Sequence, residues 1–439
     1  MKRYHSPLFL LLILPAFAFA QRSLLQSGPM LGYNEMREVM LWVQTREPAR
    51  VQFSYWVKGK PGEKFSTDEK MTLEREAFTA KLTADEVEPG TEYEYRLLIN
   101  GQEVDLDYPT EFRTQELWQW RHDPPAFSVA IGSCSYINES VYDRPGTPYG
   151  SDYQIFSTIH RMRPDAMIWL GDNVYLREVD WYSRTGIFNR YTHTRSLPEM
   201  QPLLASTHHY AIWDDHDYGP NDSDRSYVHK ETTLEAFRLF WANPTFGVNG
   251  QKGITSFFQY NDIDFFLMDD RYFRSPNRMK EGVKTMLGKE QLEWLIDALV
   301  ASYAPFKMVC IGNQVLNPVK NSETYENLFP EERAYLLKRI EEEGLKNVIF
   351  LTGDRHKSEL SKYVNAQDNT IYDLTISPLT AGVNTWEEEN ELRVEGTEVK
   401  KHNFGLLEFS GPRTGRVLTI RVIDADGNEE WSVEIPSEK

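Results

Sequence analysis

The stretch Ala166-Met167-Ile168-Trp169-Leu170-Gly171-Asp172-Asn173-Val174-Tyr175 decides the predicted fold. Its first five residues form an unbroken apolar run, which is typical of a strand buried on both faces of a sheet. Gly171 ends that run and Asp172 follows it directly. Because ligands gather in the loops after the carboxyl ends of strands in α/β sheets, the stretch predicts an α/β fold with a polar site at this edge.

Further segments have the same form, with an apolar strand followed by residues that can bind metals. They are Gly132-Ser133-Cys134-Ser135-Tyr136, Trp213-Asp214-Asp215-His216-Asp217 and Thr352-Gly353-Asp354-Arg355-His356. Strands that run in parallel end at the same edge of a sheet. We therefore expect all of these segments to contribute to one polynuclear metal site.

Asp172 and Tyr175 form a Gly-Asp-x-x-Tyr motif in which the aspartate can bridge two cations. A tyrosine becomes a ligand only as phenolate, and a phenol with a pKa near 10 needs a strongly Lewis-acidic ion to lose its proton. Ferric iron fits this requirement best. The alternative for Tyr175 is an aromatic side chain at the rim of a loop.

Cys134 ends the first strand of this set, where a nearby cation would stabilise its thiolate as a ligand. A small buried thiol and a nucleophile are the alternatives, but neither a His-Asn pair nor a Cys-x5-Arg motif accompanies the residue. Asp354 and His356 can reach the same cluster if the backbone turns at the strand end. Their alternative is a capped turn with an incidental surface histidine.

The segment after Trp213 is the densest polar cluster that follows an apolar strand. Several carboxylates buried side by side are costly unless cations offset them. Asn221 can offer a neutral carbonyl oxygen to a hard cation such as calcium. His216 is placed to orient a bound phosphate or to protonate a leaving group.

The chain divides into two parts by its pattern of strands and helices. Alternating strands predict a β-sandwich with a tyrosine corner at Tyr93, and Asp123-Pro124-Pro125 marks a linker. Strands and helices alternate after it. The expected sandwich strands are 38–44, 50–57, 78–82, 93–100 and 110–113; the later strands are 127–132, 166–170, 210–213, 307–312 and 347–352, with helices 151–162, 231–241, 289–302 and 330–343, a hairpin 257–260/265–269 around 261–264, and a meander 404–409/416–423/431–435.

The N-terminal sequence favours an exported protein. Lys2, Arg3, the apolar run 8–19 and Ala18-Phe19-Ala20 predict a signal peptide over 1–20, and Gln21 is not the cysteine of a lipoprotein. We expect a periplasmic or secreted protein without a transmembrane segment after cleavage; an uncleaved anchor is the alternative.

The formal net charge of −18 argues against a stable nucleic-acid partner. The chain has only two cysteines, Cys134 and Cys310, which excludes a disulfide framework, and we expect them to be unpaired.

The ordered motifs resemble those of the alkaline phosphatase D (PhoD-like) branch of the metallophosphoesterases. Each motif is weak alone, but together they are specific, and the likeness covers nearly the whole mature chain. They are Gly-Ser-Cys (132–134), Leu-Gly-Asp-x-x-Tyr (170–175), Trp-Asp-Asp-His-Asp (213–217), Met-Asp-Asp-Arg (268–271) and Thr-Gly-Asp-x-His (352–356). The resemblance implies an αββα four-layer sandwich over 126–439, preceded by a fibronectin III/Ig-like domain over 21–117 and a linker over 118–125.

The resemblance also implies a centre with Fe³⁺ and two Ca²⁺ ions. By motif, the iron ligands are Cys134, Asp172, Tyr175 and His356, the calcium-side ligands are Asp172, Asn221 and Asp354, and Asp215 and His216 are catalytic groups beside the metals. The loop 218–224 departs from the family pattern, so the ligand assigned as Asn221 could be a neighbouring residue. Arg271 and Arg355 are expected to touch the substrate, with salt bridges to Asp214 or Asp270 as the alternative.

The sequence thus predicts a secreted metal-dependent phosphoric ester hydrolase of the α/β class. A metal-held hydroxide or oxo group would attack phosphorus in small-molecule, lipid or nucleotide phosphate esters, because the cations carry more charge than their roughly four anionic ligands. Mono- and diesters remain equally open. The segment 179–198, aromatic and basic, is expected to form a substrate lid. The alternative function is a silent surface module whose sandwich binds a glycan or a protein partner.

Overall fold

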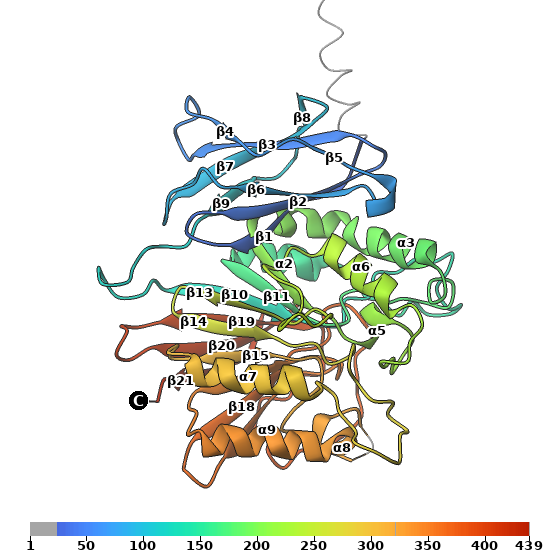
Figure 1. Cartoon of the computed structure of the whole chain (residues 1–439), viewed down its shortest axis with the longest axis vertical. Coiled ribbons are helices and arrows are strands. Elements are labelled where there is room, and N and C mark those ends of the chain that lie inside the picture. Colours follow the sequence, from blue (N-terminus) through green and yellow to red (C-terminus); the bar gives the residue numbers. More distant parts are fainter. Residues whose placement is uncertain (1–23, 321, 439) are drawn as a thin grey trace, which may run out of the picture.

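The computed structural model describes residues 24–320 and 322–438, so the predicted signal peptide lies outside the described residues. A β-rich N-terminal part caps one end of a larger α/β body (Figure 1). The largest sheet has nine strands in the order β21-β20-β19-β10-β11-β12-β1-β2-β6. Their bounds are β1 Leu25–Asn34, β2 Val39–Thr45, β6 Thr79–Ala84, β10 Phe127–Gly132, β11 Ala166–Leu170, β12 His208–Ile212, β19 Asn403–Ser410, β20 Val417–Asp424 and β21 Glu429–Pro436.

A second sheet of six strands has the order β13-β14-β15-β16-β18-β17. Its core strands β14, β15, β16 and β18 run in parallel. The bounds are β13 Ser256–Tyr260, β14 Ile263–Leu267, β15 Lys307–Cys310, β16 Val348–Thr352, β17 Glu359–Val364 and β18 Thr370–Thr375. The expected hairpin is present, but its turn is shorter than predicted because Ile263 and Asp264 already belong to β14, where Ile263 is buried.

Side-chain alternation along the second sheet builds two separate cores. Phe265 and Met308 pack into the core shared with the nine-stranded sheet. Their neighbours Phe266 and Val309 pack on the opposite face against helices α7 (Lys289–Ala301) and α9 (Pro330–Glu342). Helices α2 (Gln154–Met162), α3 (Arg184–Arg195) and α6 (Lys230–Phe240) lie on the face of the nine-stranded sheet that points away from the second sheet (Figure 1). The order of layers is therefore helix, sheet, sheet, helix, as predicted.

The helices predicted from apolar periodicity are present within a few residues of their expected bounds. The structure adds α3, the short helices α4, α5 and α8, and two 3₁₀ turns. The bounds are α2 Gln154–Met162, α3 Arg184–Arg195, α4 Gln201–Ser206, α5 Asp215–Tyr218, α6 Lys230–Phe240, α7 Lys289–Ala301, α8 Tyr325–Leu328, α9 Pro330–Glu342, η1 Glu74–Glu76 and η2 Pro198–Met200.

The N-terminal strands form the expected sandwich with its own apolar core. One layer is β1, β2 and β6; the other is the sheet β4-β3-β7-β8, with β5 and β9 paired at its edges. The predicted tyrosine corner is present, since the Glu88 amide donates to the Tyr93 hydroxyl at 2.8 Å. The strands of the second layer are β3 Arg50–Val57, β4 Phe65–Ser66, β5 Lys70–Met71, β7 Glu92–Ile99, β8 Gln102–Glu103 and β9 Glu111–Arg113.

One layer of this sandwich is continuous with the sheet of the α/β body. Strand β1 pairs in parallel with β12, where Leu31 lies opposite His208. The seam is also held by the Tyr95 hydroxyl, which donates to the Ala205 carbonyl at 2.7 Å. One layer of the sandwich is therefore an extension of the central sheet.

Cys134 and Cys310 are both buried and unpaired, as expected. Within residues 24–320 and 322–438, no helix has the length and apolarity that crossing a membrane requires.

Candidate metal centre

The segments singled out in the sequence converge at one edge of the two central sheets. Cys134 follows β10, Asp172 follows β11, and Asp215 and His216 begin α5 after β12, all at the carboxyl ends of strands in the nine-stranded sheet. Asp354 and His356 follow β16 of the second sheet. The site therefore lies where the two sheets face each other.

The backbone at these positions is in the left-handed region that non-glycine residues seldom adopt. The φ angles are 57° at Cys134, 53° at Asp172, 67° at Asp354 and 54° at His356. Each such residue costs of order 1 kcal/mol and is retained where the surroundings or a function require it. Gly171 (φ +95°) makes the turn possible at β11, because a Cβ there would lie 2.7 Å from the Cβ of Asp214.

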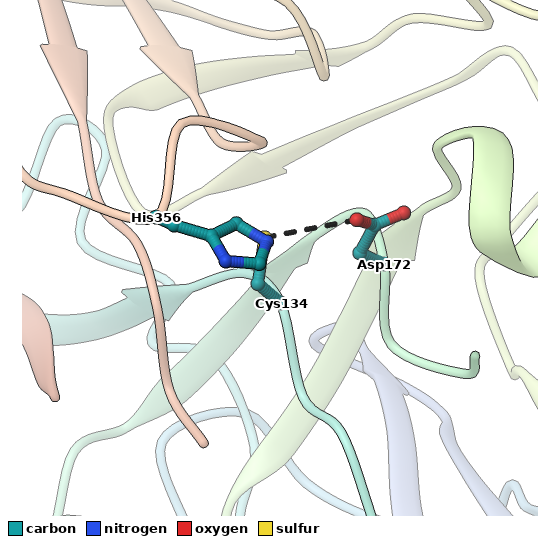
Figure 2. Close-up of side chains that lie close together, drawn as sticks. All are labelled: Cys134, Asp172 and His356. Atoms are coloured by element: carbon teal, nitrogen blue, oxygen red, sulfur yellow. Dashed lines mark hydrogen bonds between the residues drawn. The ribbon is translucent and has the colours of Figure 1, made fainter. Parts of the chain in front are cut away.

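A first donor group consists of Cys134, Asp172 and His356, whose ligand atoms all lie within 4.8 Å of one another (Figure 2). The Cys134 thiol donates to Asp172 Oδ2 at 3.7 Å. His356 Nδ1–H donates to the Gly382 carbonyl, which leaves the lone pair of Nε2 on the other side of the ring. The Tyr175 hydroxyl lies 3.2 Å from that Nε2. Tyr175 therefore adjoins this donor group.

A second donor group shares Asp172 and adds Asp215 and His216. The His216 amide donates to Asp172 Oδ1 at 3.2 Å and to Asp215 Oδ1 at 3.0 Å, so the start of α5 fixes both carboxylates. The ring of His216 stacks on that of Tyr175 with centroids 4.4 Å apart. Asp172 is therefore in the position of a bridging ligand between two groups.

A third group, Asp215, Asp222 and Glu323, was not predicted. The Asp222 amide donates to Asp215 Oδ2 at 2.7 Å, and the hydrogen bond between the Asp222 and Glu323 carboxyls raises the pKa of Asp222 to about 8. Although burial acts to raise it, Arg271 and Arg274 hold the pKa of Glu323 far below its usual range. Glu323 lies late in the long loop between β15 and α8 and not directly after a strand, so the strand-end pattern does not identify it.

The pKa values show an excess of negative charge at the centre. Burial, followed by the charge of Asp215, raises the pKa of Asp172 well above its usual value. Burial raises the pKa of Asp354 to about 7 and that of the Cys134 thiol to about 11. Burial and the charge of Asp172 also raise the pKa of Tyr175. Protein cations alone therefore do not compensate these groups.

The donor set fits a metal cluster. A thiol, a phenol, carboxylates and imidazoles converge, and His216 Nδ1 and Asp214 Oδ2 are buried without a hydrogen-bond partner among the described residues. Such unsatisfied buried atoms are rare in proteins unless an ion or water completes them. Asn221 and Asp354 are not in the first two groups; both line the cavity in front of the centre, and Asn221 is exposed.

Arg271 lies behind the centre with a fully buried side chain. Its guanidinium donates to Asp214 and pairs with Glu323 at 2.9 Å. These contacts are of the kind that the salt-bridge alternative predicts. Arg355 does line the cavity, and its partner is neither Asp214 nor Asp270 but Glu388, at 2.8 Å.

The segment 179–198 is not a lid, because most of it is the helix α3 packed into the body. Arg190 is buried and paired with Asp180 at 2.9 Å and with Glu139 at 3.1 Å. The Arg195 guanidinium lies 3.9 Å from the centroid of the Trp241 ring. Arg190 and Arg195 are thus internal ion-pair and cation–π partners, and Trp181 is the residue of the segment 179–198 that lines the cavity beside the centre.

Together, the four layers and the donor groups at the strand ends define a metallophosphoesterase fold. The chain belongs to the PhoD-like phosphatase family, whose model matches residues 129–409. A second model, described as a domain of unknown function (DUF7800), matches residues 22–117.

Individual relatives agree with this assignment. Alkaline phosphatase D of Bacillus subtilis (strain 168) is 22% identical over 333 residues, which cover 64% of this chain and 54% of that protein, so the chain spans about half the length of this curated relative. A solved structure titled "Structure of PhoD" superposes with a TM-score of 0.75 at 16% identity, covering 95% of this chain and 93% of the other. A purple acid phosphatase from yellow lupin (Lupinus luteus) seeds gives 0.65 at 13% identity, over 93% and 74% of the two chains. These structures share the fold.

Proposed function

We propose that the chain is an exported, metal-dependent phosphoric ester hydrolase with an iron–calcium centre. The observation that carries the proposal is the pair of donor groups that share Asp172 at the strand ends. Family membership supports a phosphatase activity. The silent-module alternative leaves the unsatisfied His216 Nδ1 and the left-handed backbone at Cys134 and Asp172 without a reason.

We assign Cys134, Asp172, Tyr175 and His356 to iron and Asp172, Asn221 and Asp354 to calcium. The thiol and phenol support a strongly Lewis-acidic ion, because only such an ion stabilises both deprotonated donors near neutral pH. Carboxylate and amide oxygens are the donors that calcium prefers. When bound, the cations would offset the acidic donors and attract and polarise a phosphate ester.

Asp215 and His216 would act on the substrate beside the metals. The main chain of α5 holds both residues, and the stacking on Tyr175 fixes the orientation of the His216 ring. His216 also lines a cavity that reaches the centre, so its ring can hold a proton at the oxygen of a leaving group. The substrates we propose are phosphoric mono- or diesters of small molecules, lipids or nucleotides.

The proposed domain division is a sandwich over 21–117, a linker over 118–125 and a catalytic domain over 126–439. Export to the periplasm or the medium follows from the sequence of residues 1–20. Cell fractionation of cells that produce the full-length chain tests export, and mass spectrometry identifies the N-terminus of the mature protein. A chain with an intact N-terminus in the cytoplasm contradicts export.

Elemental analysis and a visible spectrum of the purified protein test the metal assignment. We expect iron and calcium in the protein, hydrolysis of 4-nitrophenyl phosphate mono- or diesters, and a phenolate-to-iron charge-transfer band. The band should disappear in Tyr175→Phe and persist in Tyr149→Phe, whose hydroxyl contacts the other nitrogen of His356 at 3.3 Å. Zinc as the sole metal overturns the iron–calcium centre, and a metal-free protein that hydrolyses neither ester class favours the silent module.

A further inference from the structure

Two cavities meet at the centre. The larger, of 1590 Å³, is bordered by His356 and Asp354 and by acidic residues of the segment 387–391. The smaller, of 470 Å³, is bordered by His216 and by two arginines, Arg144 and Arg177. Tyr149 and Asn221 border both. The arginine-lined cavity is therefore a separate approach to the same metal donors.

Arg177 is the unusual residue in the smaller cavity. Its side chain is only 10% exposed, yet no described residue accepts a hydrogen bond from its guanidinium, and Nε is buried without a partner. The closest carboxylate, Glu178, lies 3.8 Å from Nε, beyond hydrogen-bond distance. Glu178 is also 46% exposed and already accepts two bonds from Arg144, at 3.0 and 2.7 Å.

Arg190, in the same region, shows which partners surround a structural arginine in this fold. Its side chain is 1% exposed, and it pairs with Asp180, Glu139 and Asp143 at 2.9, 3.1 and 3.7 Å. Arg177 has instead the face of the Tyr136 ring, whose centroid is 5.7 Å away. A ring contact supports the cation but uses none of its five N–H donors. A largely buried guanidinium without hydrogen-bond acceptors is costly unless a ligand completes it.

We propose that Arg177 binds an oxyanion of the substrate in this cavity and positions the ester beside His216. The inference rests on the proposed function and adds a specificity-determining residue to it. A guanidinium with free N–H groups is suited to anionic oxygens, which it can bind in pairs. The oxyanion has two possible sources: a non-bridging oxygen of the scissile phosphate, or a carboxylate or phosphate on the alcohol that the ester carries.

The experiment uses the metal-loaded, full-length chain, three variants of Arg177 and one control variant. Arg177→Met and Arg177→Gln remove the charge, and the second replaces the first if the methionine protein does not fold. Arg177→Lys restores the charge. Arg184→Met is the matched control, because Arg184 is exposed, pairs with Glu235 at 2.7 Å and does not line the cavity. Metal content and thermal unfolding are measured for every protein.

Affinity for inorganic phosphate is measured by calorimetric titration, and kcat and KM are measured for two 4-nitrophenyl diesters. Their second alcohol is ethanol in one and glycolate in the other, so that only the latter adds a carboxylate. A neutral variant that binds phosphate about 10- to 100-fold more weakly, and loses kcat/KM on both diesters, assigns Arg177 to the scissile phosphate. A loss confined to the glycolate diester and expressed in KM assigns it to the alcohol part.

Arg177→Lys is expected to recover part of either loss. Unchanged phosphate affinity together with unchanged kcat/KM on both diesters in a folded neutral variant overturns the inference. The phosphate titration needs no turnover, so it separates the two proposals: a wild-type protein that binds phosphate through Arg177 but hydrolyses no ester refutes the hydrolase and leaves the Arg177 site standing.

Discussion

The loop after β16 contributes to two buried charged clusters, which offset the charge of neighbouring carboxylates in opposite ways. Asp354 belongs to the acidic metal centre. Lys357, three residues later, belongs to an ion-pair network, which includes Glu359, Glu388, Arg393 and Glu398. Both clusters contain several carboxylates next to one another. They differ in where the compensating cations come from.

In the ion-pair network the protein supplies its own cations. Lys357 is fully buried, and its ammonium lies 3.0 Å from Glu398 and 3.4 Å from both Glu359 and Glu388. Arg393 adds a bond of 2.6 Å to Glu359. At the metal centre burial, followed by the charges of Asp215 and Cys134, raises the pKa of Asp172. The difference teaches that an unbalanced buried carboxylate cluster marks a place for external cations, whereas a balanced one marks structure.

Asp172→Asn breaks the metal side of this comparison and should have the largest effect. The amide cannot bridge two cations, so we expect loss of both iron and calcium. The fall in kcat/KM should be well over about 100-fold, since even groups that only orient metal ligands cost 10- to 100-fold. Metal content per chain and ester hydrolysis are the measurements, with Asp424→Asn in the β20–β21 turn as the control.

The same variant should have the opposite effect on the stability of chelator-treated protein. Without metals, holding the buried Asp172 carboxyl costs free energy at pH 8 that an asparagine does not incur. The metal-free variant should therefore be more stable than metal-free wild type by about 1–3 kcal/mol. A variant that keeps its metals, or a metal-free variant that is less stable, contradicts the description of Asp172 as an uncompensated ligand.

Lys357→Met tests the ion-pair network, which is the structural cluster of this comparison. It leaves three carboxylates with one cation fewer, and removal of one partner from a buried pair typically costs about 3–5 kcal/mol in the free energy of unfolding. Urea denaturation measures this cost. Metal content should not change, because Lys357 offers no ligand to the centre. Lys401→Met is the control: Lys401 is 57% exposed and its pair with Glu430 should contribute less than about 1 kcal/mol. Loss of metals from folded Lys357→Met would show that the clusters are coupled.

The sequence predicted those parts of the fold that depend on local pattern. The apolar runs at Ala166–Leu170 and Val348–Thr352 are strands, and the polar residues behind them meet because parallel strands end at one edge. Strand β1 was missed because its sequence contains Gly28 and Pro29, and its register against β2 is irregular. Its place beside β12 depends on contacts across about 170 residues, which no local pattern encodes.

The remaining errors concern the partners of charged side chains. Arg190 and Arg195 looked like lid residues because a sequence does not show that Asp180 and Trp241 cover them. Glu323 belongs to the third donor group only because the loop after β15 folds back onto Asp215. The pairing of Arg355 with Glu388 joins positions 33 residues apart. Ion pairs between loops are set by tertiary structure, so residue type and spacing predict the strand-end ligands better than their partners.

His209 tests a third way to bury a titratable group, which is to keep it neutral. Its Nδ1 accepts from Trp169 Nε1 at 3.0 Å and its Nε2–H donates to the Leu203 carbonyl at 3.2 Å, so the ring is satisfied only when uncharged. Burial lowers the pKa of His209 to about 3 from 6.5. Between these values the unfolded chain binds the proton more tightly, so this contribution to stability is complete above pH 6.5 and decreases as the pH falls.

Between pH 7.5 and 5.5 the loss from His209 should be about 1.4 kcal/mol, which is the smallest of the predicted effects. His209→Gln carries a constant cost but removes this pH dependence. The free-energy difference between wild type and variant, measured by urea denaturation at both pH values, should therefore shrink by that amount on acidification. His122→Gln, at a ring that is 50% exposed, is the matched control for a histidine-to-glutamine change at the surface. A constant difference for His209→Gln would mean that the folded protein accommodates the imidazolium, and that neutrality is not required at this buried position.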